Sequence, residues 1–198
     1  MKAISHDVLK GIEPEIEKVH SCIVNAVRHY QERIGDESGT HSPLTKASYI
    51  RHQIIENIKK DFFGNPKVEI KRKRGMTSLV IHTEPIIVLK FKKFDKNNRV
   101  CPTRTMQSYM YSNQLHLFPE YSRTVNLHAG YKWDDTGTMV ECIIGMPNSE
   151  REHAWIVVLK DRSIAPEATE AKTVFSEEIK PNIKLKVKEI RNKNEQAG

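Results

Sequence analysis

The residues of this chain with the clearest chemical potential are lysines and arginines gathered between positions 67 and 104. Eleven basic residues stand there against three acidic ones, a net charge of +8, whereas the whole chain of 198 residues carries +7. The rest of the molecule is therefore close to neutral. A concentrated cationic stretch suits a phosphate backbone, because each neutralised phosphate releases counterions. The charge pattern favours nucleic acid, above all DNA, as the partner.

The basic residues form two clusters with the spacing of strands. Side chains alternate along a strand, so Lys71 and Lys73 share one face of the first cluster, and Lys90 and Lys92 share one face of the second. The sequence does not say whether these faces coincide. The residues that we expect at a nucleic-acid interface are Lys71, Arg72, Lys73, Arg74, Lys90, Lys92, Lys93, Arg104, Gln107 and Tyr111. The alternative is a purely structural role, in which the lysines bind nothing and only keep an exposed sheet edge from aggregating.

Two amphipathic helices are expected before the basic clusters. Apolar residues recur at steps of three or four from Ile12 to Ile34, which predicts one buried stripe, with Pro14 in the first turn. A second helix is expected from about 47 to 62. Residues 35–46 show no periodicity and are typical of a polar loop.

Strands that position the clusters follow the second helix. Branched and aromatic residues predict strands over 68–73, 77–82 and 85–91, and the run IIVLKF in the last one indicates burial on both faces. A third helix is expected from Pro102 to about Leu115, with Thr103 as its cap. Three more strands are expected after it, over 125–131, 139–146 and 154–159, and the loop WDDTG joins the first two into a hairpin.

Together these elements predict an α/β fold. It has a central mixed sheet flanked by helices, in an αβββαβ core with a C-terminal β-hairpin extension. Three regions are expected along the chain. Residues 1–46 form the N-terminal amphipathic helix and linker, residues 47–162 form the α/β core, and residues 163–198 form a flexible basic tail with too little apolar content to fold alone.

The order helix, three strands, helix, strand from residue 47 resembles the core of the PD-(D/E)xK nuclease superfamily. In such nucleases, acids on the second and third strands hold a divalent metal that activates water, and a lysine two residues after the third-strand acid stabilises charge. Here Phe91-Lys92 matches the end of that motif, but Lys90 replaces its acid. Gln107 and Tyr111 resemble a QxxxY element found in some members.

The resemblance implies a nuclease core that is catalytically incomplete. An ammonium group at Lys90 repels the ion that a carboxylate would hold, and only Glu56 and Glu84 are placed to substitute. We therefore name Glu56, Glu84 and Lys92 as catalytic candidates but expect no metal, no cofactor and no nuclease activity. An active metal-dependent nuclease is the third hypothesis.

A second resemblance covers Lys90 to Leu159. Its features are Lys90-Phe-Lys-Lys, Leu127-His-Ala-Gly-Tyr131 and Thr136-Gly-Thr138, together with single residues nearby, among them Asp95, Thr105, Gln107, Gln114, Pro147 and Trp155. This stretch is similar to an uncharacterised bacterial family from mobile-element and phage-defence neighbourhoods. The resemblance implies a bacterial accessory or defence role and no particular chemistry.

Other motifs with chemistry are sparse. The three cysteines, Cys22, Cys101 and Cys142, are far apart and form no CxxC pair, which suits a reducing cytoplasm and excludes a zinc ribbon. Cys101 has no neighbouring base and reads as a buried or inert thiol. His52 and Glu56 lie one helical turn apart, a spacing more typical of a surface pair than of a metal site. No apolar run reaches eighteen residues, so we expect no membrane association.

A protein-interaction component, such as a toxin, antitoxin or inhibitor, is the alternative function. Residues 123–159 contain Tyr131, Trp133 and Trp155, which can anchor a partner or pack inward. A partner can also add a strand to the sheet edge. The N-terminal helix is the other candidate surface.

Overall fold

The computed structural model describes residues 2–73, 75–103, 105–115, 118–121, 123–133 and 139–159. All of them belong to one compact unit that spans Met1–Asp161. Arg74, Arg104 and the predicted tail over 163–198 lie outside the described residues. The predictions made for them stay predictions.

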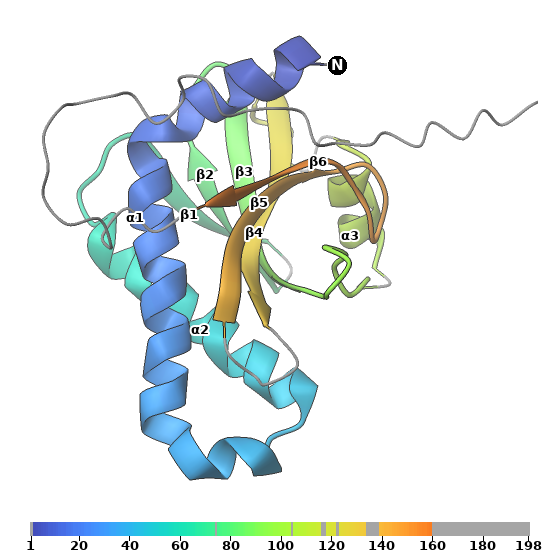
Figure 1. Ribbon diagram of the computed structural model, residues 1–198. Helices are drawn as coiled ribbons and strands as arrows, with labels where there is room; N and C mark the ends of the chain where they lie inside the picture. Colours follow the sequence, from blue (N-terminus) through green and yellow to red (C-terminus); the bar gives the residue numbers. More distant parts are fainter. Residues whose placement is uncertain are drawn as a thin grey trace, which may run out of the picture. The chain divides into compact units, whose positions relative to one another are not determined.

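A six-stranded mixed sheet forms the centre of this unit, with its strands in chain order (Figure 1). The strands are β1 (Val68–Lys73), β2 (Met76–Ile81), β3 (Ile86–Phe94), β4 (Thr124–Trp133), β5 (Met139–Pro147) and β6 (His153–Leu159). Neighbours run antiparallel except β3 and β4, which are parallel. The predicted α/β class with a mixed sheet is confirmed.

Helices α1 (Lys2–Ile34) and α2 (Pro43–Asp61) bury one face of the sheet. The apolar stripe predicted for the first helix is buried there, together with apolar residues of α2, β2, β3 and β4. The fully buried residues of this shared core include Ile12, Val19, Ile23, Val27, Tyr30, Ile50, Ile54, Ile58, Leu79, Ile81, Ile87, Leu89, Leu127 and Ala129. The first helix therefore packs into the same core as α2 and the sheet.

The boundaries of both helices differ from the prediction. The α1 helix begins at Lys2, so Pro14 lies inside it rather than in its first turn. A proline removes a backbone donor and crowds the preceding turn, and α1 bends in its first half (Figure 1). The predicted loop 35–46 is instead a 3-10 helix, Gly35–Thr40, followed by α2. The Ser42 side chain caps α2 by accepting a hydrogen bond from the Thr45 amide, 3.1 Å away.

The third helix, α3 (Met106–Ser112), covers the opposite face of the sheet and connects β3 with β4. It is shorter than predicted and is capped by Thr105, not Thr103. A smaller apolar cluster lies beneath it, formed by Met76, Val80, Val88, Tyr111 and Phe118. Tyr111 is fully buried, and its hydroxyl lies against the backbone carbonyls of Val88, at 2.8 Å, and Leu127. This side chain fixes α3 over the parallel strand pair.

A glycine allows β4 to approach β3 closely. Gly130 pairs with Lys92 in the sheet register, and a Cβ atom at Gly130 would lie 1.7 Å from the Lys92 carbonyl oxygen. No real side chain tolerates that separation, so only glycine fits without moving the backbone. Within the described residues, no helix has the length and apolar character needed to cross a membrane.

Candidate functional site

The two lysine clusters lie on the same face of the sheet, the face that α3 covers. The registers of β1 with β2 and of β2 with β3 carry the alternation of side chains across the sheet without a slip. Lys71, Lys73, Lys90 and Lys92 therefore all belong to that face. Arg72 alternates to the opposite face of β1 and is exposed to solvent.

The first cluster is already partnered by the chain itself. The Lys71 ammonium lies 2.5 Å from a Glu120 carboxylate oxygen and 4.4 Å from the centre of the Tyr121 ring. The hydrogen bond to Glu120 raises the pKa of Lys71. The Lys73 ammonium lies 5.4 Å from the centre of the Phe118 ring. This half of the cationic face is thus partly neutralised.

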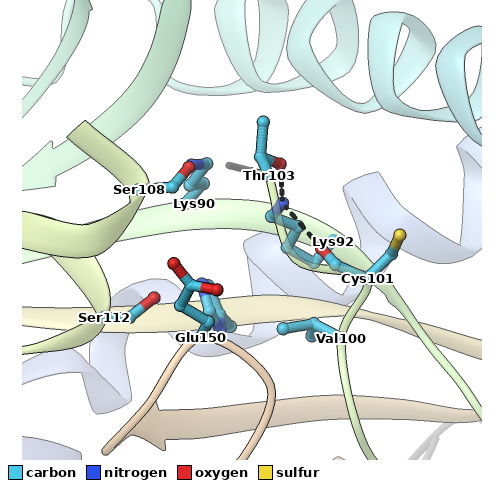
Figure 2. A pocket seen from close by; sticks show the side chains of 9 residues that line it. Lys90, Lys92, Val100, Cys101, Thr103, Ser108, Ser112 and Glu150 are labelled. Atoms are coloured by element: carbon cyan, nitrogen blue, oxygen red, sulfur yellow. Dashed lines mark hydrogen bonds between the residues drawn. The ribbon is translucent and has the colours of Figure 1, made fainter. Parts of the chain in front are cut away.

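The second cluster lines a pocket between β3 and α3, called here the lysine pocket (Figure 2). Its lining residues are Lys90, Lys92, Val100, Cys101, Thr103, Ser108, Ser112, His128 and Glu150. They come from β3, the segment after it, α3, β4 and the loop between β5 and β6. The cavity volume of about 10 Å³ holds roughly one water molecule.

Lys90 is the most deeply placed cation of the pocket, with only 8% of its surface exposed. Its ammonium donates a hydrogen bond to Ser108 Oγ at 3.3 Å and lies 5.4 Å from the centre of the Tyr111 ring. Burial, and then the positive charges of Lys92 and Arg51, lower the pKa of Lys90 to about 8. The amine is thus held in a site that disfavours its charged form.

Lys92 lies two residues further along β3 and is half-buried. Its ammonium donates to Thr103 Oγ1 at 3.1 Å and to the Cys101 carbonyl at 3.4 Å (Figure 2). Burial and the Arg51 charge lower the pKa of Lys92 as well. Among the described residues, neither Lys90 nor Lys92 forms an ion pair with a carboxylate.

A pair of histidines lies at the site, with His128 buried in the pocket lining and His153 half-buried beside it. His128 of β4 is 2% exposed, stacks on the Tyr111 ring at 5.3 Å and lies 3.0 Å from His153 of β6 through ring nitrogens. Burial, followed by the charges of His153, Lys92 and Lys90, lowers the pKa of His128 well below its usual value. His128 therefore stays neutral at physiological pH, which limits the positive charge of the pocket.

Several pocket residues were missed by the sequence analysis, among them Ser108, Ser112, His128 and Glu150. Ser108, His128 and Glu150 meet Lys90 and Lys92 in the pocket, but each lies on an element that is far from β3 in the sequence. Alternation in β4 places His128 on a polar face, which is a signal that the sequence contains. Glu150 lies on the loop before β6, with its carboxylate toward β3 (Figure 2), and no local pattern marks it.

The catalytic candidates do not converge. Glu56 lies on α2 and pairs with Lys59 at 2.7 Å. Glu84 precedes β3, whereas Lys92 lies near the end of that strand, so they are separated by on the order of 20 Å at the rise of a strand. Within the described ranges, no three His, Cys, Asp or Glu residues lie together as metal ligands.

Two other expected interface residues are not positioned to contact a ligand. Tyr111 points from α3 into the core and is fully buried, and its hydroxyl lies against strand carbonyls. Its assignment to the interface is therefore corrected. Gln107 is half-buried and lies 3.5 Å from the Lys73 carbonyl. Lys93 is exposed on the opposite face of β3 from Lys92. Cys101 is exposed and not buried as one reading expected.

The aromatic residues of the hairpin face inward. Tyr131 is 2% exposed, and Trp133 and Trp155 are half-buried against the core beneath α1. They therefore form no exposed aromatic anchor for a protein partner. The N-terminal helix is also occupied, since its apolar stripe packs on α2 and the sheet.

Comparisons of the chain with protein-family models, with curated proteins and with solved structures give no match.

Proposed function

We propose that this chain binds nucleic acid, with duplex DNA as the preferred ligand, by holding a backbone phosphate at the solvent side of the lysine pocket, where Lys92 lies. The observation that supports it most is the state of Lys90 and Lys92. Within the described residues, the hydrogen-bond acceptors of both ammonium groups are neutral, namely the hydroxyls of Ser108 and Thr103 and the Cys101 carbonyl. Desolvated charge without a counter-charge is costly, and a phosphate supplies what is missing.

Three other lysines among the described residues provide a contrast. Lys59, Lys71 and Lys132 each lie within 3 Å of a carboxylate oxygen, and each is therefore partly neutralised in the free protein. An external anion gains less from binding at such sites, because it must compete with the resident carboxylate. On the α3 face, Lys71 and Lys132 are therefore weaker candidates for holding an external anion than Lys90 and Lys92.

The element order supports a nuclease-like core. The sequence α2, β1, β2, β3, α3, β4, with β3 and β4 parallel, agrees with the predicted αβββαβ arrangement. The nucleases carry acids on the second and third strands. Here Ser78 of β2 and Lys90 of β3 are buried on the α3 face, where those acids would stand, and this favours binding over hydrolysis. A bacterial accessory or defence role stays a prediction.

Salt titrations of binding test this proposal. A fluorescent DNA duplex is titrated with the protein between 50 and 200 mM salt, and the slope of log affinity against log salt is about −0.9 for each phosphate neutralised. We expect Lys92→Ala to weaken binding and to flatten the slope by about one phosphate. Lys71→Ala changes both less, because Glu120 already partners that charge.

The matched control is Lys60→Ala, which removes an exposed lysine from α2 outside the pocket. It is expected to leave the affinity nearly unchanged. Binding that does not respond to salt, no binding at low salt, or an equal loss in the control and in Lys92→Ala would contradict the proposal. Tighter binding to an RNA of the same length would replace DNA as the ligand. Incubation with Mg²⁺ or Mn²⁺ is expected to leave the duplex intact.

A further inference from the structure

We infer that the lysine pocket captures abasic sites in DNA, with the Lys90 amine forming an imine with the sugar aldehyde. The inference rests on the proposed DNA binding and adds a substrate class to it. Its basis is the place of the Lys90 amine, deep in a pocket and 3.3 Å from Ser108 Oγ, with no ion pair to a carboxylate of the described part of the chain. The groups around the amine match those that imine formation requires.

A lysine becomes a nucleophile when it is desolvated or lies next to another cation. Lys90 meets both conditions, because it is 8% exposed and lies near Lys92 and Arg51. With its pKa at about 8, roughly a tenth of the molecules carry a neutral amine at pH 7, compared with less than a thousandth for an ordinary lysine.

The size and charge of the pocket select the electrophile. Room for about one water molecule excludes a base, so the electrophile that reaches the Lys90 amine must be small, such as the terminal aldehyde of an open-chain sugar. Lys92 is less buried and lies toward the solvent side, where it can hold an adjacent phosphate. An abasic site in DNA offers both groups together, an aldehyde at C1′ and phosphates on the same sugar.

The chemistry that follows needs no metal and no oxidant. The neutral amine adds to C1′, and Ser108 can relay the proton from nitrogen to oxygen. Loss of water then gives the iminium ion. This cation acidifies the C2′ hydrogen, which passes to the Glu150 carboxylate, while the C3′–O bond breaks and the 3′ phosphate leaves. Hydrolysis of the imine returns the Lys90 amine and an unsaturated aldehyde on the cleaved strand.

Reductive trapping tests the inference with the full-length protein. A duplex with one abasic site is incubated with the protein, EDTA and sodium borohydride, which reduces the imine to a stable amine. We expect a covalent protein–DNA adduct that mass spectrometry locates at Lys90. Because the neutral fraction of Lys90 grows, the trapping rate is expected to rise about fivefold from pH 7 to pH 8. An adduct at another residue, or none, would overturn the inference.

Two variants and one ligand separate this inference from the proposed function. Lys90→Arg keeps a positive charge but cannot form an imine, so trapping is expected to fall on the order of tenfold or more even at protein concentrations that saturate the DNA. Glu150→Gln keeps trapping but slows strand cleavage, and unchanged cleavage would overturn the role of Glu150. A tetrahydrofuran site, which lacks the aldehyde, is bound but not trapped. Binding without trapping refutes only the imine, whereas loss of all DNA binding refutes the proposed function as well.

Discussion

The two faces of the sheet are built from different chemistry, although the same strands supply both. The face beneath α1 and α2 is almost wholly apolar, and Glu15 on α1 is the exception among its buried residues. The face beneath α3 buries Ser78, Lys90, Asn126 and His128, together with hydroxyls of α3 itself. Burying polar groups costs free energy. Hydrogen bonds offset part of this cost for Lys90, Asn126 and His128, and the proposed DNA binding would give the α3 face a use for its polar groups.

If the two faces differ in this way, the largest loss of stability should come from a truncation on the apolar face beneath α1 and α2. Replacing Ile54 with alanine leaves a cavity in the core between α2 and the sheet, where Ile54 is 1% exposed. The free energy of unfolding is expected to fall by about 2–5 kcal/mol. Urea denaturation measures it. A loss below about 1 kcal/mol would mean that this face is less tightly packed than its burial indicates.

On the α3 face, Lys90→Met is expected to raise the free energy of unfolding instead of lowering it. Because the pKa of Lys90 is about 8 when folded and 10.5 when unfolded, the unfolded chain binds more protons between these values, so wild-type stability rises with pH there. Methionine removes this penalty. The variant is expected to be more stable by up to about 3 kcal/mol below pH 8, and the difference should shrink toward pH 10.5.

Urea melts of the wild type and Lys90→Met at a series of pH values check this prediction. Lys92→Met serves as the companion variant, since its pKa is lowered for the same reason and its side chain is less buried. A Lys90→Met protein that is less stable at every pH would show that the amine stabilises the fold, and the contrast between the two faces would fail.

Acid provides a smaller effect on the same face. His128 is neutral when folded because its pKa lies well below 6.5, whereas the unfolded chain takes up a proton below that value. Stability should therefore fall as the pH drops from 6.5 toward about pH 5, by up to about 1.4 kcal/mol per pH unit for this residue. His128→Phe keeps the ring stacked on Tyr111 and should show a shallower acid slope in melts at matched ionic strength.

The smallest effect is expected outside both faces. Lys59→Ala removes the exposed ion pair with Glu56 on α2, and exposed pairs of this kind contribute little because solvent screens them. The midpoint of thermal unfolding should stay where it is for the wild type. A clear drop would show that the outer surface of α2 contributes to stability more than its exposure allows.

Much of the framework was predictable because it follows from local periodicity. The stripe from Ile12 to Ile34 specified a helix, and the run from Ile86 to Phe91 specified a central strand, since in each case the spacing of apolar residues fixes what must be buried. Boundaries were less predictable. Thr105 caps α3 although Thr103 was expected, because two similar caps stand close together and packing decides between them.

For the candidate site, the sequence predicted the positive charge but not the pocket around it. Alternation places Lys90 and Lys92 on one face, but nothing local says that α3 covers that face or that Tyr111 fills the space beneath it. Glu150 and His128 come from elements that meet the lysines only in the folded chain. The need for glycine at position 130 depends on the approach of the Lys92 carbonyl, a contact between residues far apart in sequence.

The parallel pairing of β3 and β4 has a consequence for the order of folding. Strands β1, β2 and β3 meet through short turns, whereas β4 can join β3 only after residues 95–123 have closed a long connection. Closing a longer loop costs more entropy and slows folding. We therefore expect the first three strands to form before the lysine pocket, whose groups come together only when β4 and α3 dock. Pulsed amide exchange during refolding should protect Leu79 before Ala129, and the lysine pocket would then form after the first three strands.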